Sequence, residues 1–401
     1  MNIIELIIED FDPVEFYLGL HREQSVSFLH TGLMTDRDHW SVLAWAPQRT
    51  IVRWEDLPRD CSRHPCKLPF CGGVIGVLPY DSGGGLLPPV IAYEYDQFLC
   101  YDLKTGKVYT SAPEFVMEMW QRPKLRHSEQ TSIRLQPLWT HLDYAKRFNR
   151  IKEFILDGDI YQVNLSYPWT ARFTSDARGL FARLCKQHPS SMSAYIQGDD
   201  FELVSCSPER FLALDGNVVQ TMPIKGTRPR GATPVEDQRM HDELLSSAKE
   251  TAELAMITDL LRNDIGQVCQ IGSVEVKQFK AIQQWPTVWH THSLIEGVLA
   301  DRYHAIDLLR ACFPGGSVTG CPKRRAMEII QEVEQSPRGL YTGSVINLSQ
   351  CGKMDSNIVI RSLVASKNAL TLNVGGGIVV DSDCNAEYQE TLDKAKAFLS
   401  L

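Results

Sequence analysis

Short apolar runs separated by glycine, proline and aspartate fill the first third of the chain and predict β-strands joined by tight turns. A polar segment with two prolines, 122–137, is predicted to link this region to the rest of the chain. We therefore expect an N-terminal β-rich region, 1–125, that packs on a larger core. The predicted strands are 3–8, 25–29, 42–45, 74–78 and 98–103.

Beyond the linker, apolar positions recur at helical spacing. The first predicted helix, 142–156, ends at the helix-stopping segment 157–159, and a strand is predicted at 160–167. Strands and helices come in clusters instead of strict alternation, which favours an α+β fold with antiparallel sheets. The other predicted helices are 180–186, 237–261, 305–311, 323–334 and 386–399.

The composition favours a protein that acts on a small molecule. With 401 residues, 43% of them hydrophobic, the chain can bury a large core, and its formal net charge of −8 argues against nucleic-acid binding. No basic segment precedes the apolar residues at the start, and no apolar run reaches the roughly 18 residues of a membrane span. We expect a cytoplasmic protein with neither a nucleic-acid nor a membrane partner.

The 11 cysteines lack the spacing of a disulfide framework, which fits a reducing cytoplasm. One cluster of potential ligands consists of Cys61, His64, Cys66 and Cys71. It contains no Cys-x-x-Cys pair and matches no common zinc or iron–sulfur pattern. Free thiols in a loop are therefore the expectation.

Two pairs of glutamates at i, i+3 spacing are candidates for cation binding. Glu250 and Glu253 project from the apolar face of the helix at 249–264, where unpaired carboxylates are unfavourable to bury. Glu387 and Glu390 repeat this spacing near the start of the last predicted helix. Carboxylates without accompanying His or Cys ligands indicate Mg²⁺. The alternative is two solvated acidic helix starts, which suit the helix dipole.

Two glycine-rich segments and one lysine add further candidate chemistry. Segment 313–323 leads into a helix, and 375–377 separates two predicted strands. Each exposes backbone amides to an anion or else forms an ordinary turn. Lys225 ends an apolar run, where burial favours a free nucleophilic amine. Glu209 lies on the preceding strand or turn, so the alternative for Lys225 is a plain ion pair.

Together these segments resemble the chorismate-utilising enzymes, the family of anthranilate synthase component I, in their order along the chain. The resemblance covers about residues 140–401, which we expect to form the chorismate-binding catalytic domain. It implies two large antiparallel sheets packed face to face with helices outside. The segments that carry it are 158–164, 207–209, 223–227, 249–264, 313–323, 338–343, 358–361 and 375–390.

The resemblance also implies a magnesium site. Glu253 and Glu390 would hold the ion directly, and Glu250 and Glu387 would hold it through water. The ion would bind the ring carboxylate of chorismate and stabilise charge as it shifts through the diene.

The catalytic residues that the resemblance implies are Glu209 as general acid, Lys225 as nucleophile at C2 of chorismate, and His290 as the family's active-site histidine. His292, two residues further on, has no functional counterpart in the family and is expected to be structural. The residues expected to bind the substrate are Arg361, Tyr341, Gln162, Thr319, Lys323, Gly375, Gly376 and Gly377.

Two side chains separate the branches of the family. Members that use water as nucleophile carry a lysine where this chain has Gln162, which favours ammonia. Anthranilate synthase carries alanine where this chain has Lys225, whereas aminodeoxychorismate synthase carries lysine. The resemblance thus implies amination of chorismate at C4, the step that leads to para-aminobenzoate and folate. The alternatives are anthranilate synthase and a non-catalytic paralogue that binds the amidotransferase.

A partner subunit is implied as well. Ammonia would come from a separate glutamine amidotransferase, because no cysteine here has the nucleophile-elbow context of that activity. In relatives the N-terminal region holds tryptophan in a regulatory pocket. Segment 7–10 departs from the usual Leu-Glu-Ser type of motif, so tryptophan is not expected here.

Overall fold

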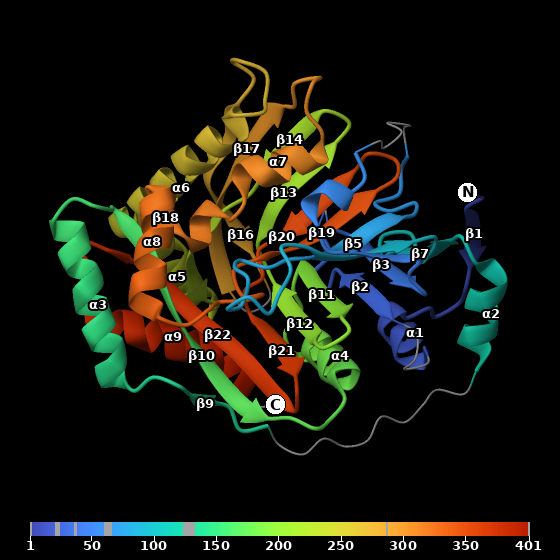
Figure 1. Cartoon of the computed structure of the whole chain (residues 1–401), viewed down its shortest axis with the longest axis horizontal. Helices are drawn as coiled ribbons and strands as arrows, with labels where there is room; N and C mark the ends of the chain where they lie inside the picture. Colours follow the sequence, from blue (N-terminus) through green and yellow to red (C-terminus); the bar gives the residue numbers. More distant parts are fainter. Residues whose placement is uncertain are drawn as a thin grey trace.

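Two sheets with helices on their outer faces form the layers of the fold (Figure 1). Three clusters of buried apolar side chains lie between these layers. The computed structural model describes residues 2–20, 25–35, 38–59, 66–122, 133–285 and 288–399. One cluster lies between two antiparallel sheets, where Val42 and Phe98 of the first sheet meet Ile75 and Val345 of the second. The other two clusters lie on the outer faces under the helices. The predicted α+β fold with two sheets packed face to face is confirmed.

The first sheet has 12 strands within the described residues. In spatial order it contains β1 (Ile4–Ile7), β8 (Lys107–Thr110), β7 (Gln97–Asp102), β3 (Trp40–Trp45), β2 (Val26–His30), β11 (Met192–Gln197), β12 (Glu202–Ser207), β21 (Ser362–Ser366), β22 (Ala369–Val379), β10 (Gln162–Arg172) and β18 (Gly320–Cys321), with β9 (Gln136–Pro137) beside β10.

The second sheet has 10 strands within the same residues. Its order is β15 (Ile224–Pro229), β17 (Val288–Val298), β14 (Val218–Thr221), β13 (Arg210–Asp215), β20 (Met354–Asn357), β19 (Ser344–Ser349), β5 (Gly73–Leu78), β6 (Ile91–Tyr95) and β4 (Arg49–Ile51), with β16 (Glu275–Gln284) beside β17. Strands from the first 125 residues extend both sheets: β2 pairs with β11, and β5 pairs with β19.

Helices cover the outer faces. The first sheet packs against α1 (Pro13–Gly19), α2 (Pro113–Gln121), α3 (His141–Leu156), α4 (Ala177–Gln187), α8 (Lys323–Glu334) and α9 (Cys384–Leu399). The second packs against α5 (Pro234–Ser246), α6 (Ala248–Gly266) and α7 (Ala305–Cys312), and short 3₁₀ turns form η1 (Trp54–Asp56) and η2 (Gly316–Val318). No helix among the described residues is both long and apolar enough to cross a lipid bilayer.

Local capping explains where the observed helices depart from the predicted ones. The predicted helix 237–261 is wrong as one element, because it consists of α5 and α6 with a break at Ser247. The Ser247 hydroxyl accepts a hydrogen bond from the backbone N–H of Glu250 (3.3 Å) and starts the second helix. Helices α1 and α2 went unpredicted, although Asp12 caps α1 and Pro13 and Pro113 open the two helices.

A buried ion pair joins the end of helix α8 to strand β10 and the η2 turn. Arg338 donates to Glu334 Oε1 (2.7 Å) and Oε2 (2.9 Å), and both side chains are 2% exposed. Glu334 Oε1 also accepts from the backbone N–H of Ser166 on β10 (2.8 Å). The Arg338 guanidinium donates further to the carbonyls of Asn164 (2.7 Å) and Val318 (2.9 Å). Helix α8, strand β10 and turn η2 are thereby held in fixed positions.

Substitution Glu334→Gln tests this connection. It leaves a buried guanidinium without its counter-charge, and we expect the free energy of unfolding to fall by about 3 kcal/mol. The measurement is urea denaturation followed by circular dichroism. Glu153→Gln is the control, because Glu153 makes an exposed ion pair with Arg150 and its loss is expected to change stability by less than about 1 kcal/mol. Equal effects of the two substitutions would contradict the structural role of the buried pair.

Candidate active site

Lys225 and Glu209 approach each other at the η2 turn. Lys225 lies on β15, and Glu209 lies between β12 and β13. The Lys225 ammonium donates to the backbone carbonyl of Ser317 (3.5 Å), and the Ser317 hydroxyl donates to Glu209 Oε1 (2.6 Å). The two predicted catalytic groups therefore contact the same residue, Ser317: Lys225 through its backbone carbonyl and Glu209 through its hydroxyl.

Burial controls the protonation of Glu209. The side chain is buried, and burial raises the pKa of its carboxyl group, while the Ser317 hydroxyl, Lys225 and Arg361 oppose this shift. The raised pKa favours the protonated form. A protonated carboxyl next to an amine is suited to give a proton to a leaving group.

Arg361 places a positive charge beside Glu209. Its backbone has a φ of 50°, in the left-handed region, where the chain passes from β20 to β21. Burial lowers the pKa of its guanidinium, and Cys206 and Glu209 partly offset this shift. Within the part of the chain that the structure describes, the guanidinium makes no hydrogen bond. It is therefore available to a carboxylate of a ligand.

His290 is neutral at physiological pH. It lies on β17, and its Nδ1 atom is hydrogen-bonded to the Thr227 hydroxyl (2.8 Å). Burial, followed by the nearby charge of Arg361, lowers the pKa of the imidazole to about 4. His290 thus adds a neutral polar group opposite Thr227, two residues after Lys225 on β15.

Three of the four predicted metal carboxylates are coupled through lysines. The Lys249 ammonium lies 3.0 Å from Glu387 Oε1 and 3.8 Å from Glu253 Oε1. Burial raises the pKa of Glu253, although Lys225 and Lys249 oppose this shift. At Glu390 burial also opposes ionisation, but Lys394 (2.7 Å) and the other lysines outweigh it and lower the pKa. Carboxylates from α6 and α9 thus lie close to the ammonium groups of Lys249 and Lys394.

Glu250 lies at the edge of this group. Its Oε1 atom accepts from Arg228 (2.8 Å), whereas its Oε2 atom is buried without a hydrogen-bond partner. A Cβ atom on Gly226, next to Lys225, would be only 3.2 Å from the Glu250 carboxyl carbon. A buried carboxylate oxygen without a partner is chemically suited to a hard cation such as Mg²⁺, although no three of these carboxylates have ligand atoms within 4.8 Å of one another among the described residues.

The three glycines at 375–377 lie inside a strand, so the predicted turn is wrong. Gly375, Gly376 and Gly377 belong to β22 and pair with residues 164–166 of β10. Their lack of side chains allows a close approach of β10 at two positions: a Cβ on Gly375 would lie 2.6 Å from the carbonyl oxygen of Leu165, and one on Gly377 would clash with the Gln162 side chain. A Cβ on Gly376 would be at ordinary contact distance from α9, 3.5 Å from Glu387 Oε2 and 3.9 Å from Glu390 Oε1.

The remaining substrate-binding candidates lie around the same strands. Gln162 is buried on β10, with its Nε2 atom only 2.5 Å from the position of a Cβ on Gly377 and its Oε1 atom without a hydrogen-bond partner. Thr319 follows η2, and its carbonyl accepts from the backbone N–H of Asn164 (2.8 Å). Tyr341 is buried, and burial raises the pKa of its hydroxyl to about 12, which keeps the hydroxyl protonated.

Lys323 and His292 have other surroundings. The Lys323 ammonium donates to Asp264 Oδ2 (2.6 Å) and to the carbonyl of Cys312 (2.7 Å), so it ties the start of α8 to α6 and α7. His292 is buried on β17 and pairs with Ile224 of β15, one residue before Lys225. Lys323 shares no hydrogen bond with the other candidates among the described residues.

Four site residues were absent from the sequence prediction: Ser317, Lys249, Lys394 and Arg228. Ser317 lies within the glycine-rich segment 313–323, which marked its location but not its contact with Glu209. Lys249 and Lys394 each stand four residues from a predicted carboxylate, at Glu253 and Glu390. That i, i+4 spacing was the available signal for both lysines.

A separate cavity of about 130 Å³ opens where N-terminal strands meet the rest of the fold. Buried Arg210 at its wall pairs with Asp38, and with Asp355 (2.9 Å). The described lining does not include segment 7–10. The other lining residues come from β2, β3, β11, β19, β20 and the loops beside them.

Comparison with known proteins identifies the family of the chain. The family model described as chorismate binding enzyme matches residues 33–400. Aminodeoxychorismate synthase component 1 of Escherichia coli (strain K12) is 39% identical over 406 residues, covering 97% of this chain and 88% of that protein. Anthranilate synthase component 1 1 of Haloarcula marismortui is 37% identical over 377 residues, covering 84% and 77%.

A solved structure extends the agreement to three dimensions. The crystal structure of anthranilate synthase component I from Streptococcus pneumoniae TIGR4 has a TM-score of 0.81 with 27% sequence identity, and 98% of this chain and 99% of that chain are covered. The chain belongs to the family of chorismate binding enzymes. The predicted family is confirmed.

Substitution Glu209→Gln tests the burial of this carboxyl. A pKa raised in the folded state means that its contribution to stability is complete below the ordinary carboxyl pKa of about 4.3 and is lost as pH rises through the raised value. Glutamine does not ionise, so we expect the variant to become more stable than the parent chain as pH rises through this window. Urea denaturation at a series of pH values measures the difference.

The exposed Glu332→Gln substitution is the control for Glu209→Gln, because Glu332 pairs with Arg150 at the surface. Its stability should follow that of the parent chain at every pH. A difference between Glu209→Gln and the parent that does not change with pH would show that Glu209 ionises normally in the folded protein.

Proposed function

We propose that this protein converts chorismate and ammonia to 4-amino-4-deoxychorismate, with Mg²⁺, and that it receives ammonia from a glutamine amidotransferase subunit. The observation that carries the proposal is the convergence of Lys225 and Glu209 on Ser317 (3.5 and 2.6 Å). The Lys225 amine and a carboxyl whose pKa is raised by burial thus both contact Ser317, which supports a nucleophile and a general acid acting together. The relative from E. coli named aminodeoxychorismate synthase component 1 supports this choice of product.

The residues supply a nucleophile and an acid in the order that the reaction needs. The Lys225 amine, once deprotonated, attacks C2 of chorismate while the double bonds shift and the C4 hydroxyl leaves. Glu209 gives its proton to that hydroxyl, so that water departs. Ammonia then adds at C4, the double bonds shift back, and Lys225 is expelled from C2. One ammonia is incorporated and one water is released.

Binding of chorismate uses the charges around this space. Arg361 supports a carboxylate of the substrate, because its buried guanidinium has no hydrogen bond to the described residues. Glu253, Glu390, Glu250 and Glu387 would hold Mg²⁺, which would bind the ring carboxylate and stabilise developing charge. The Gln162 Oε1 atom, buried without a partner, is suited to accept a hydrogen bond from ammonia or from the substrate hydroxyl.

Anthranilate synthesis is the second candidate, because the relative from Haloarcula marismortui carries that name. It uses the same two substrates and differs in the carbon that receives ammonia. Purified protein incubated with chorismate, Mg²⁺ and ammonium distinguishes the two. The proposal requires 4-amino-4-deoxychorismate as the main product, and fluorescent anthranilate formed without a lyase would reject it.

Lys225→Ala tests the covalent step. We expect formation of 4-amino-4-deoxychorismate to fall on the order of 100-fold or more, since the nucleophile is lost, and a share of anthranilate to appear. Liquid chromatography of the products measures both. Lys353→Ala, which removes a partly buried lysine paired with Asp215, is the control and should leave the products unchanged. An unchanged output from Lys225→Ala would remove lysine from the mechanism.

Glu253→Gln tests the metal site. Loss of one negative ligand should raise the Mg²⁺ concentration needed for half-maximal turnover by roughly 10- to 100-fold. Asp259→Asn is the matched control, because Asp259 lies on the same helix α6 in an exposed pair with Arg262. If both variants require the same Mg²⁺ concentration as the parent chain, Glu253 does not hold the ion.

A further inference from the structure

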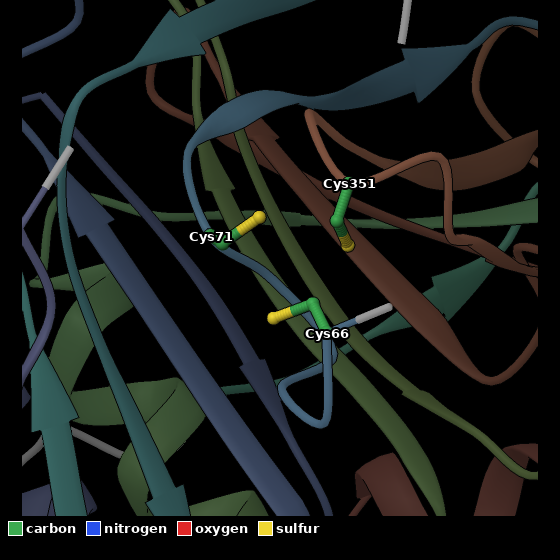
Figure 2. A group of neighbouring side chains, drawn as sticks. All are labelled: Cys66, Cys71 and Cys351. Carbon is green, nitrogen blue, oxygen red and sulfur yellow. The ribbon is translucent and has the colours of Figure 1, made fainter. Parts of the chain in front are cut away.

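Three cysteines from distant parts of the sequence meet at one end of the second sheet. Cys66 and Cys71 precede β5, and Cys351 lies in the turn between β19 and β20 (Figure 2). Their sulfur atoms all lie within 4.8 Å of one another. They are the one set of three or more potential ligand atoms that close together among the described histidines, cysteines and acids.

The backbone holds the two segments in contact. The carbonyl of Gly72 accepts from the N–H of Gln350 (2.8 Å), and the N–H of Cys71 donates to the Ser349 hydroxyl (3.0 Å). Gly73 has a φ of 132°, and a Cβ there would lie 2.2 Å from the carbonyl oxygen of Leu348. No other residue type fits this close approach without a shift, so the glycine brings the thiols of the two segments together.

The Ser349 side chain contacts two of the three sulfur atoms. The Ser349 hydroxyl lies 3.3 Å from Cys71 Sγ and 3.2 Å from Cys351 Sγ. Cys351 is buried, and Cys66 and Cys71 are half-buried. A metal-bound thiolate commonly accepts hydrogen bonds from its surroundings, and a hydroxyl between two sulfurs can supply one.

The distances suit a thiolate-bound metal. Zinc binds sulfur at about 2.3 Å in a tetrahedral arrangement, so two sulfurs on one ion lie about 3.8 Å apart. Sulfurs already within 4.8 Å reach this separation by small rotations of their side chains. Soft thiolates select zinc over the hard Mg²⁺ that the carboxylates fit.

We propose that Cys66, Cys71 and Cys351 bind one zinc ion that fastens the segment before β5 to the β19–β20 turn. Each thiol releases its proton to solvent as its sulfur donates an electron pair to the ion, and the fourth position takes water or another ligand. Cys61 and His64, grouped with Cys66 and Cys71 in the sequence, lie outside the described residues. The free thiols expected from the sequence are confirmed for Cys66 and Cys71, and the proposal adds a metal ion that they bind.

This site is distinct from the candidate active site. Cys351 lies three residues before the start of β20, whereas Ile358, directly after the other end of β20, donates its backbone N–H to the Glu209 carbonyl (3.1 Å). The zinc ion therefore acts on the folding of the N-terminal strands and not on the reaction. The inference does not depend on the proposed function.

The test measures metal in protein purified with reductant and with Mg²⁺ present throughout. We expect about one zinc per chain by mass spectrometry. Replacement by Co²⁺ should give the intense near-ultraviolet absorption of cobalt–thiolate bonds. A zinc chelator should lower the melting temperature by several degrees, because the bound ion stabilises only the folded chain.

Cys351→Ser should lose the zinc and the cobalt absorption, while Cys384→Ser, which removes a half-buried thiol at the start of α9, should keep both. If Cys351→Ser does not fold, the zinc content of Cys66→Ser, compared with that of the parent chain, tests the proposal instead. Three results would overturn the proposal: no zinc or cobalt binding by the folded parent chain, equal loss from the Cys384 variant, or a Cys71–Cys351 disulfide formed in place of metal binding.

Discussion

The buried pair of Arg338 and Glu334 is the interaction on which the candidate site depends. A guanidinium and a carboxylate removed from water require every donor and acceptor to be used. Here the carboxylate accepts from β10, and the guanidinium donates to carbonyls on β10 and in η2. Because η2 contains Ser317, the residue between Lys225 and Glu209, this pair sets the position of the reactive groups without contacting them.

Charge balance explains the arrangement around the carboxylates. Glu253 on α6 and Glu387 and Glu390 on α9 repel one another when ionised, and lysines are placed among them. Lys249 on α6 contacts Glu253 on its own helix and Glu387 on α9, and Lys394 contacts Glu390 within α9. A cation that replaces these contacts must compete with two ammonium groups, and the open side of Gly376 leaves space for α9 to adjust.

The sequence predicted features that depend on local spacing. Helix α8 has the predicted bounds, and α3 differs by one residue, because capping and apolar periodicity are local. The paired glutamates were also visible at i, i+3 spacing. The break at Ser247 was missed since apolar spacing continues across it. The place of Gly375 to Gly377 within β22 was missed because the close approach of β10, which explains glycines in a strand, is visible only in the fold.

Contacts between segments far apart in the sequence could not be predicted from local spacing. Ser317 touches Glu209, which lies more than one hundred residues earlier in the sequence, and Cys351 approaches Cys66 and Cys71 only because β5 pairs with β19. Neither contact is marked by a repeat or a characteristic residue spacing in the sequence. The resemblance to a family supplied the roles of Lys225 and Glu209, whereas the residue that joins them came from the fold.

The interleaving of the sheets has a consequence for synthesis on the ribosome. Strand β5 pairs with β19, and β10 pairs with β22. Each of these pairings can form only after the later strand, β19 or β22, has left the ribosome. Such non-local pairing slows folding and leaves apolar strand edges open during translation. The nascent chain must therefore remain soluble with unpaired strands for most of its synthesis, and chaperones that shield such edges would have the greatest effect on its yield.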